Sequence, residues 1–172
     1  MKKTKVLMFL SLLVAMDVVL NRFLSFDTDI LRVSFGFIPQ SFSAILFGPL
    51  VGGISSAIAD IIGMIIAPKG PYFPGFTLSS LLTGIIYGLF LYKKPKTLPR
   101  ITLAVLFIVL FVDLGLNTYW LTILWGKGYL LILPTRVIKS LLVLPVQVSS
   151  IYLLWRYAGN FVEKNMIYKL GR

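Results

Sequence analysis

Long apolar stretches alternate with short polar connections along the whole chain. Most of these stretches reach the ~17–25 residues that a helix needs to cross the hydrocarbon core of a bilayer. They lack the alternation of apolar and polar residues that is typical of membrane β-strands, so helices are the remaining way to pair every backbone group inside lipid. The pattern predicts an all-α integral membrane protein in which residues 1–172 form one transmembrane domain, with helices at roughly 6–24, 37–47, 50–67, 75–92, 101–124 and 129–157.

One apolar run, from Phe37 to Ala67, is too long for an ordinary single span and contains one pair of helix-breaking residues, Gly48-Pro49. It forms either one kinked helix or two short helices. The basic residues decide between these alternatives, because lysine and arginine concentrate in the cytoplasmic loops of membrane proteins. Two helices put both termini and the basic 93–100 connection on one side, which then carries most of the basic residues. The sequence thus predicts a six-helix bundle with both termini in the cytoplasm.

The composition agrees with this interpretation and excludes several kinds of chemistry. Hydrophobic residues make up 58% of the chain and charged residues 13%, which leaves too little polar surface to enclose the apolar side chains in a soluble fold. The chain has neither cysteine nor histidine, which excludes disulfides, thiolate nucleophiles, histidine bases and nearly all zinc or haem sites. We expect no metal site and no cofactor. The net charge of +11 is mostly a signal of membrane topology, and nothing supports a nucleic-acid partner.

Several ionisable or amide side chains lie within the predicted helices, all in the outer half of the membrane or near its midplane. A charged side chain inside a bilayer costs roughly 2.5–3.5 kcal/mol on insertion scales, and such residues usually face a partner or a water-filled cavity. Their common depth predicts a polar pocket that opens to the outside. The residues concerned are Asp17, Asp60, Asp113, Asn117, Arg136, Lys139 and Gln147.

Structural roles compete with ligand contact for these residues. Arg136 and Lys139 could reach the outer lipid headgroups, or pair with an aspartate inside the bundle. Their occurrence together favours a binding role. Trp120 follows Asn117 by three residues on the same helical face, and we expect it to stack on a ligand, whereas Trp125 is more typical of the aromatic belt at the membrane surface.

Five segments of the chain resemble a known family of membrane proteins. They read RVSFGFIP, FGPLVGGISSAIADIIG, YFPGFTLSSLLTGIIYG, LNTYWLTILWGK and ILPTRVIK. Together they resemble the substrate-binding S components of energy-coupling factor (ECF) vitamin transporters, and most closely the folate-specific members. The resemblance covers nearly the whole chain and is weakest in residues 93–112 and in the tail.

The resemblance implies how such a protein works and what it contacts. It implies a multi-pass protein of the bacterial plasma membrane that captures a vitamin from outside and is not an enzyme. Its partners would be a transmembrane coupling subunit and two cytoplasmic ATPases, so that ATP is used by partner subunits alone. Family members are thought to topple within the membrane to release substrate inward. The small-residue motif of the family's first helix falls on Ser11 and Ala15, where serine replaces the usual alanine, and we expect these residues to dock the coupling subunit.

Folate chemistry suggests roles for the candidate residues. A folate has a flat pterin rich in hydrogen-bond donors and acceptors, an aromatic aminobenzoate and an anionic glutamate tail. Its site should supply aromatic faces for the pterin, Asp or Asn for the amino edge, and Arg or Lys for the carboxylates. The residues that we expect to do this are Arg32 and Arg136 for anionic or polar ligand atoms, Asp60 and Asn117 for pterin hydrogen bonds, Phe35, Phe73 and Trp120 for stacking, and Lys139 as a secondary contact.

Three other functions remain open from the sequence. An S component for thiamine, riboflavin or biotin would share the fold and differ in the pocket. A stand-alone channel or facilitator would need polar residues along the whole path, but the inner halves of the predicted helices carry almost none. A membrane enzyme acting through Asp60 and Asp113 has no paired-aspartate motif in its favour.

Overall fold

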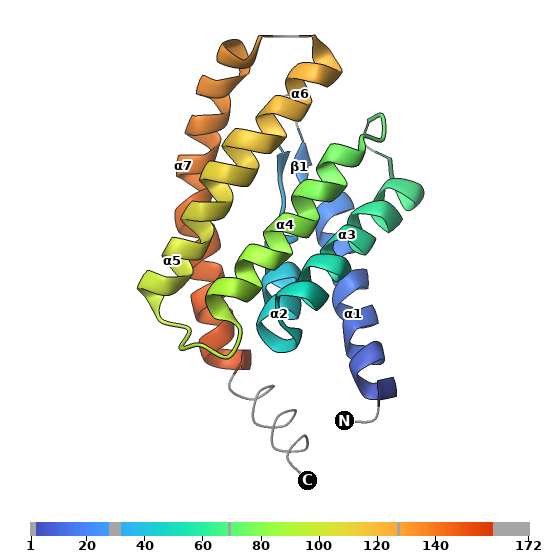
Figure 1. The fold of residues 1–172 in the computed structure, drawn as a ribbon, viewed down its shortest axis with the longest axis vertical. Coiled ribbons are helices and arrows are strands. Elements are labelled where there is room, and N and C mark those ends of the chain that lie inside the picture. Colours follow the sequence, from blue (N-terminus) through green and yellow to red (C-terminus); the bar gives the residue numbers. More distant parts are fainter. Residues whose placement is uncertain (1–2, 28–31, 69, 127, 160–172) are drawn as a thin grey trace.

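The computed structural model describes residues 3–27, 32–68, 70–126 and 128–159, and it shows a bundle of helices (Figure 1). The helical prediction is confirmed, with one short antiparallel pair added to it, in which Phe26 pairs with Val33 and Asp27 with Arg32. In chain order the elements are α1 (Lys3–Arg22), β1 (Phe26–Asp27), β2 (Arg32–Val33), α2 (Phe37–Phe47), α3 (Pro49–Ile66), α4 (Pro74–Leu91), α5 (Leu98–Phe107), the π-helix η1 (Ile108–Asn117), α6 (Thr118–Trp125), α7 (Tyr129–Leu154) and the π-helix η2 (Trp155–Gly159).

Within the described residues, five helical stretches are long and apolar enough to cross a membrane, and the longest two include the π-helices. Helix α2, with 11 residues, is shorter. At 1.5 Å per residue it rises only about 16 Å, roughly half the thickness of the hydrocarbon core, so α2 is packed within the bundle against α3 and α4. The five stretches are Thr4–Arg22, Pro49–Ile66, Pro74–Leu91, Leu98–Trp125 and Tyr129–Tyr157.

The turn between α2 and α3 lies at the Gly48-Pro49 pair. Gly48 has a φ of +93°, a conformation that L side chains rarely adopt and glycine adopts readily. Pro49 is the first residue of α3, where its missing N–H breaks no helical hydrogen bond. The apolar run between Phe37 and Ala67 therefore folds as two helices rather than as one kinked helix.

Helices α3 and α4 approach so closely that their backbones meet. A Cβ added to Gly84 would overlap the carbonyl group of Gly52, and a Cβ added to Gly88 would overlap Pro49. Small residues at such crossings hold helices together in lipid, where van der Waals packing replaces the hydrophobic effect. The two helices form one closely packed wall of the bundle.

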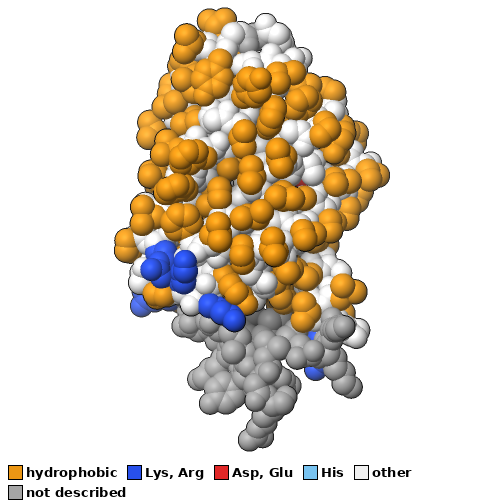
Figure 2. Space-filling view, viewed as in Figure 1, with side chains coloured by type: hydrophobic (Ala, Val, Ile, Leu, Met, Phe, Trp, Pro, Cys, Tyr) orange, Lys and Arg blue, Asp and Glu red, His pale blue; other side chains and the backbone are white. Residues whose placement is uncertain are grey.

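The outside of the bundle is apolar (Figure 2). Ile65, Leu130 and Leu131 are about three-quarters exposed, and many other large apolar side chains lie at the surface with them. A continuous apolar surface of this extent suits contact with lipid. The view also shows Lys and Arg side chains at the end where α4 meets α5, a connection that contains Lys93, Lys94 and Lys96. The fold is thus a membrane bundle.

Candidate functional site

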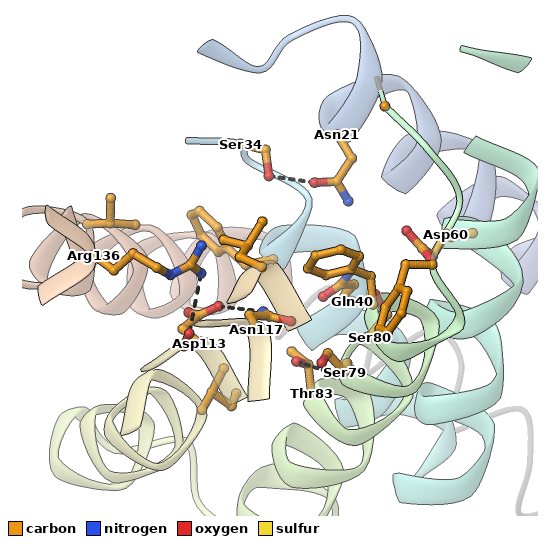
Figure 3. Close-up of a pocket in the computed structure, with 18 of the residues that line it drawn as sticks. Asn21, Ser34, Gln40, Asp60, Ser79, Ser80, Thr83, Asp113, Asn117 and Arg136 are labelled. Carbon is orange, nitrogen blue, oxygen red and sulfur yellow. Dashed lines mark hydrogen bonds between the residues drawn. The ribbon is translucent and has the colours of Figure 1, made fainter. Parts of the chain in front are cut away.

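A large cavity lies between the helices, and polar side chains project into it (Figure 3). Its volume is about 1180 Å³, at the upper end of the roughly 300–1,000 Å³ of typical small-molecule sites. Its mouth includes Gly70, Pro71 and Tyr72, in the connection between α3 and α4. The lining also comes from α1, α2, η1, α6 and α7, so the cavity is a property of the whole bundle.

Two helices present one face each to this cavity, with the same spacing. Residues three, four, seven and eleven positions apart lie on one face of an α-helix. Both helices run from the mouth of the cavity towards the opposite end of the bundle (Figure 1). The two stripes are Phe76, Ser79, Ser80, Thr83 and Tyr87 on α4, and Arg136, Lys139, Ser140, Val143 and Gln147 on α7.

A cluster around Asp113 joins η1 to α7. Arg136 is 8% exposed, and its guanidinium donates a hydrogen bond from Nη2 to the Asp113 carbonyl oxygen, at 3.3 Å. The Asn117 side chain donates from Nδ2 to Asp113 Oδ1, at 3.1 Å (Figure 3). Asp113 and Asn117 belong to the π-helix η1, and π-turns within helices often mark functional sites. The cluster places an arginine, a carboxylate and an amide on one wall of the cavity.

A second cluster around Asp60 joins three helices on the opposite side. Arg22 of α1 forms an ion pair with Asp60 of α3, with 3.3 Å between Nη2 and Oδ1. Thr77 of α4 donates a hydrogen bond from Oγ1 to Asp60 Oδ2, at 2.8 Å. The Arg22 side chain is 3% exposed and that of Asp60 is 19% exposed. Both carboxylate oxygens thus already accept hydrogen bonds within the protein, which gives Asp60 a structural role in addition to its place on the cavity wall.

A third polar chain links α1 to the segment before α2 and to α2 itself. Asn21 and Gln40 both donate hydrogen bonds to Asp17 Oδ1, and Ser34 donates to the Asn21 side-chain oxygen. Asn21, Ser34 and Gln40 line the cavity and Asp17 lies behind them. Sequence reasoning missed these three residues, although Asn21 stands four positions after Asp17 on one helical face and Gln40 interrupts an apolar run.

The structure brings most of the predicted site residues to the cavity. Asp60, Phe73, Asn117, Arg136 and Lys139 line it. Their contact with a ligand stays a prediction.

Two other predicted residues lie outside the cavity lining, and the side chain of a third is not among those described. Trp120 lies behind the lining, where its indole N–H donates to Ser79 Oγ at 3.2 Å and its ring packs 5.5 Å from that of Phe73. Phe35 is 36% exposed and contacts Phe37 rather than the cavity. Arg32 begins β2, and its side chain lies outside the described part of the structure.

Several buried polar atoms on the cavity wall have no hydrogen-bond partner within the described residues. They include Tyr87 Oη, Asn117 Oδ1, Arg136 Nε and Gln147 Oε1. Buried donors and acceptors are nearly always satisfied in folded proteins, so unsatisfied ones that face a cavity indicate that a bound molecule or water completes them. The arrangement suits a ligand that carries both donors and acceptors and some negative charge.

The family model described as "ECF-type riboflavin transporter, S component" matches residues 1–164. The folate transporter FolT of Clostridium novyi (strain NT) is 41% identical over 172 residues, which cover all of both chains. The folate transporter FolT of Leuconostoc mesenteroides subsp. mesenteroides is 36% identical over 157 residues, 88% of this chain and 84% of that protein. A solved structure titled "Crystal structure of FolT bound with folic acid" superposes with a TM-score of 0.84 and 40% identity, covering 88% of this chain and 92% of that one.

Proposed function

Since the chain belongs to the family of ECF-type transporter S components, we propose that it is a folate-binding S component, a multi-pass cell-membrane protein that captures the vitamin for uptake. The two curated relatives are named as folate transporters, and the matching solved structure holds folic acid. The family model is named after riboflavin, but the full-length identity of 41% is to a folate transporter. These relatives support folate over riboflavin as the ligand.

The observation that carries this proposal is the cavity with unsatisfied polar atoms on its wall. Arg136 and Lys139 supply positive charge for the glutamate carboxylates of a folate, and charge-assisted hydrogen bonds to carboxylates are among the strong ones. Asn117 offers an amide oxygen without a partner among the described residues, suited to an N–H group of the ligand. Phe73 supplies an aromatic face near the mouth.

The test is ligand binding by the purified protein in detergent. Folic acid should raise its unfolding temperature, because a ligand that binds only the folded state stabilises it by mass action. Riboflavin and thiamine at the same concentration should not. Trp125 lines the cavity, so quenching of tryptophan fluorescence gives an independent titration. Stabilisation by riboflavin and none by folic acid would replace the proposed ligand.

The orientation in the membrane is also a proposal. The start of α1, the end of α7 and the basic α4–α5 connection lie at one end of the bundle, opposite the mouth of the cavity (Figure 1). Lys93, Lys94 and Lys96 at that end fit the cytoplasmic side, where basic residues concentrate. Both termini then lie in the cytoplasm and the cavity opens outwards.

Uptake requires partners that supply energy, and we place their docking surface on α1. Ser11 and Ala15 are exposed, four positions apart, and therefore on one face of that helix. The Ser11 hydroxyl donates to the Leu7 carbonyl oxygen within the same helix, at 2.9 Å, so its donor is satisfied even where the helix faces lipid. Such a small-residue face lets another helix approach closely. The partners would be a transmembrane coupling subunit and two ATPases, which use the ATP.

Ala15→Trp tests this surface. The bulky side chain should leave folic acid affinity unchanged in detergent, because Ala15 faces away from the cavity, and should lower both ATP-dependent uptake and copurification of the coupling subunit several-fold. Ile138→Trp is the matched control, since Ile138 is 61% exposed on α7 and lies on another face of the bundle. Equal uptake by the two variants would remove the docking role from α1.

A further inference from the structure

The inner end of the cavity is formed by uncharged residues. The lining stripe of α4 ends at Tyr87 and that of α7 ends at Gln147, each eleven positions, or about 16 Å, beyond the first residue of its stripe. Both helices run inwards from the mouth (Figure 1). The residues that accompany Tyr87 and Gln147 at this inner end are Thr83, Ile108, Val109 and Val143.

The charged lining residues lie closer to the mouth. Arg136 and Lys139 come early in the α7 stripe, and Asp113 lies at the level of Arg136, which donates a hydrogen bond to its carbonyl oxygen. Asp60 lies near the end of α3 that leads to the mouth, where it pairs with Arg22. Placing a carboxylate at the inner end would remove its hydration and bring it no cation in exchange, which is costly. An elongated ligand with a charged tail and an uncharged ring system should therefore enter with the ring system first.

Two polar atoms at the inner end have no partner in the described part of the chain. Tyr87 is fully buried, and both its hydroxyl and Gln147 Oε1 lack a hydrogen bond. A phenol can donate and accept, and an amide offers both functions side by side, so together they match a planar heterocycle with alternating donors and acceptors on its edge. A buried polar group without a partner costs stability, which a ligand bound there would recover.

We propose that Tyr87 and Gln147 bind the hydrogen-bonding edge of the ligand's uncharged heterocycle at the inner end of the cavity, and so help to select the vitamin. This inference rests on the proposed folate function and adds an orientation, with the pterin innermost and the glutamate tail at the level of Arg136 and Lys139. Neither Tyr87 nor Gln147 carries a charge that would single it out in the sequence, and their position at the inner end follows from the packing of α4 and α7.

The experiment compares two ligands that share the pterin. Folic acid carries the glutamate tail and pteroic acid lacks it. Tyr87→Phe and Gln147→Met should each weaken both ligands by the same factor, roughly three- to tenfold, the effect of one neutral hydrogen bond. Tyr152→Phe is the matched control, because Tyr152 is partly buried against the hydrophobic core and should leave both affinities unchanged. Wild-type affinities in Tyr87→Phe and Gln147→Met, or a loss seen with folic acid but not with pteroic acid, would overturn the proposal.

A stability measurement separates ligand recognition from a structural role. Because the Tyr87 hydroxyl has no partner among the described residues, Tyr87→Phe should leave the unfolding temperature of the ligand-free protein unchanged or raise it. A lowered unfolding temperature would assign the hydroxyl to the fold and contradict the inference. If the unaltered protein bound riboflavin and no folic acid, the proposed function would fail first; if it bound folic acid and the variants did too, only this inference would fail.

Discussion

Asp60→Ala is expected to destabilise the protein by about 3 kcal/mol. Removing one partner of a buried ion pair costs about 3–5 kcal/mol, because the remaining charge stays in a poorly solvated place. Arg22 is 3% exposed, which fits that case, and the 19% exposure of Asp60 puts the expected effect at the lower end of the range. The variant also takes an acceptor from Thr77 of α4, so three helices lose a common contact. The unfolding temperature in detergent should fall by about 6–12 °C.

A double substitution distinguishes this mechanism from a general loss of packing. Arg22→Met combined with Asp60→Leu removes both charges and keeps similar volume, and replacement of a whole buried pair by apolar residues is often neutral. The double variant should therefore be more stable than Asp60→Ala alone. Equal or additive losses would show that the ion pair does not set the stability of this region.

A second variant of Asp60 distinguishes a structural role, the joining of helices, from contact with the ligand. Asp60→Asn keeps the shape and an acceptor for Thr77, but removes the charge. If the main role of Asp60 is to join helices, this variant should lower the unfolding temperature and leave folic acid affinity nearly unchanged. The reverse result would restore Asp60 to the pterin contact that the sequence suggests.

The helices could be predicted because lipid allows few alternatives. An apolar stretch in a membrane protein must pair its backbone internally, so length and composition suffice to place helices, and Gly48-Pro49 marks the one break inside a long run. The short β1–β2 pair and the π-helix η1 could not be predicted in this way. Each depends on local hydrogen bonding that leaves no mark on the hydrophobic pattern.

The candidate site was most predictable where it carries a charged or amide side chain inside an apolar stretch. Arg136 and Lys139 stood out because a charged side chain inside a bilayer is costly and usually faces a partner or a water-filled cavity. Arg22 did not, since an arginine at a helix end is ordinary, and its burial against Asp60 results from the packing of α1 on α3. Trp120 stands three positions after Asn117, beyond the junction between the π-helix η1 and α6, and it packs against Phe73 and Ser79 behind the cavity lining. Its stacking on a ligand stays a prediction.

Arg136→Ala is expected to weaken folic acid binding by about 1.5–3 kcal/mol, roughly 10- to 150-fold in the dissociation constant. Arg136 is 8% exposed, one of its guanidinium N–H groups already donates to the Asp113 carbonyl oxygen, and Nε has no partner among the described residues. It is therefore held in place on the cavity wall with a donor that remains to be paired, and a charge-assisted hydrogen bond from arginine to a carboxylate is among the strong ones. Isothermal titration of the purified variant gives the affinity.

Two further variants make the Arg136 result specific. Arg136→Lys keeps the charge but loses the planar fork, so it should recover part of the affinity and not all of it. Arg100→Ala removes an arginine at the opposite end of the bundle, in the first turn of α5, and should leave the dissociation constant unchanged, because no ligand in the cavity reaches it. A folded Arg136→Ala protein with wild-type affinity would mean that the guanidinium only joins η1 to α7. The anionic tail of the ligand would then be bound by Lys139 or by a positive charge nearer the mouth.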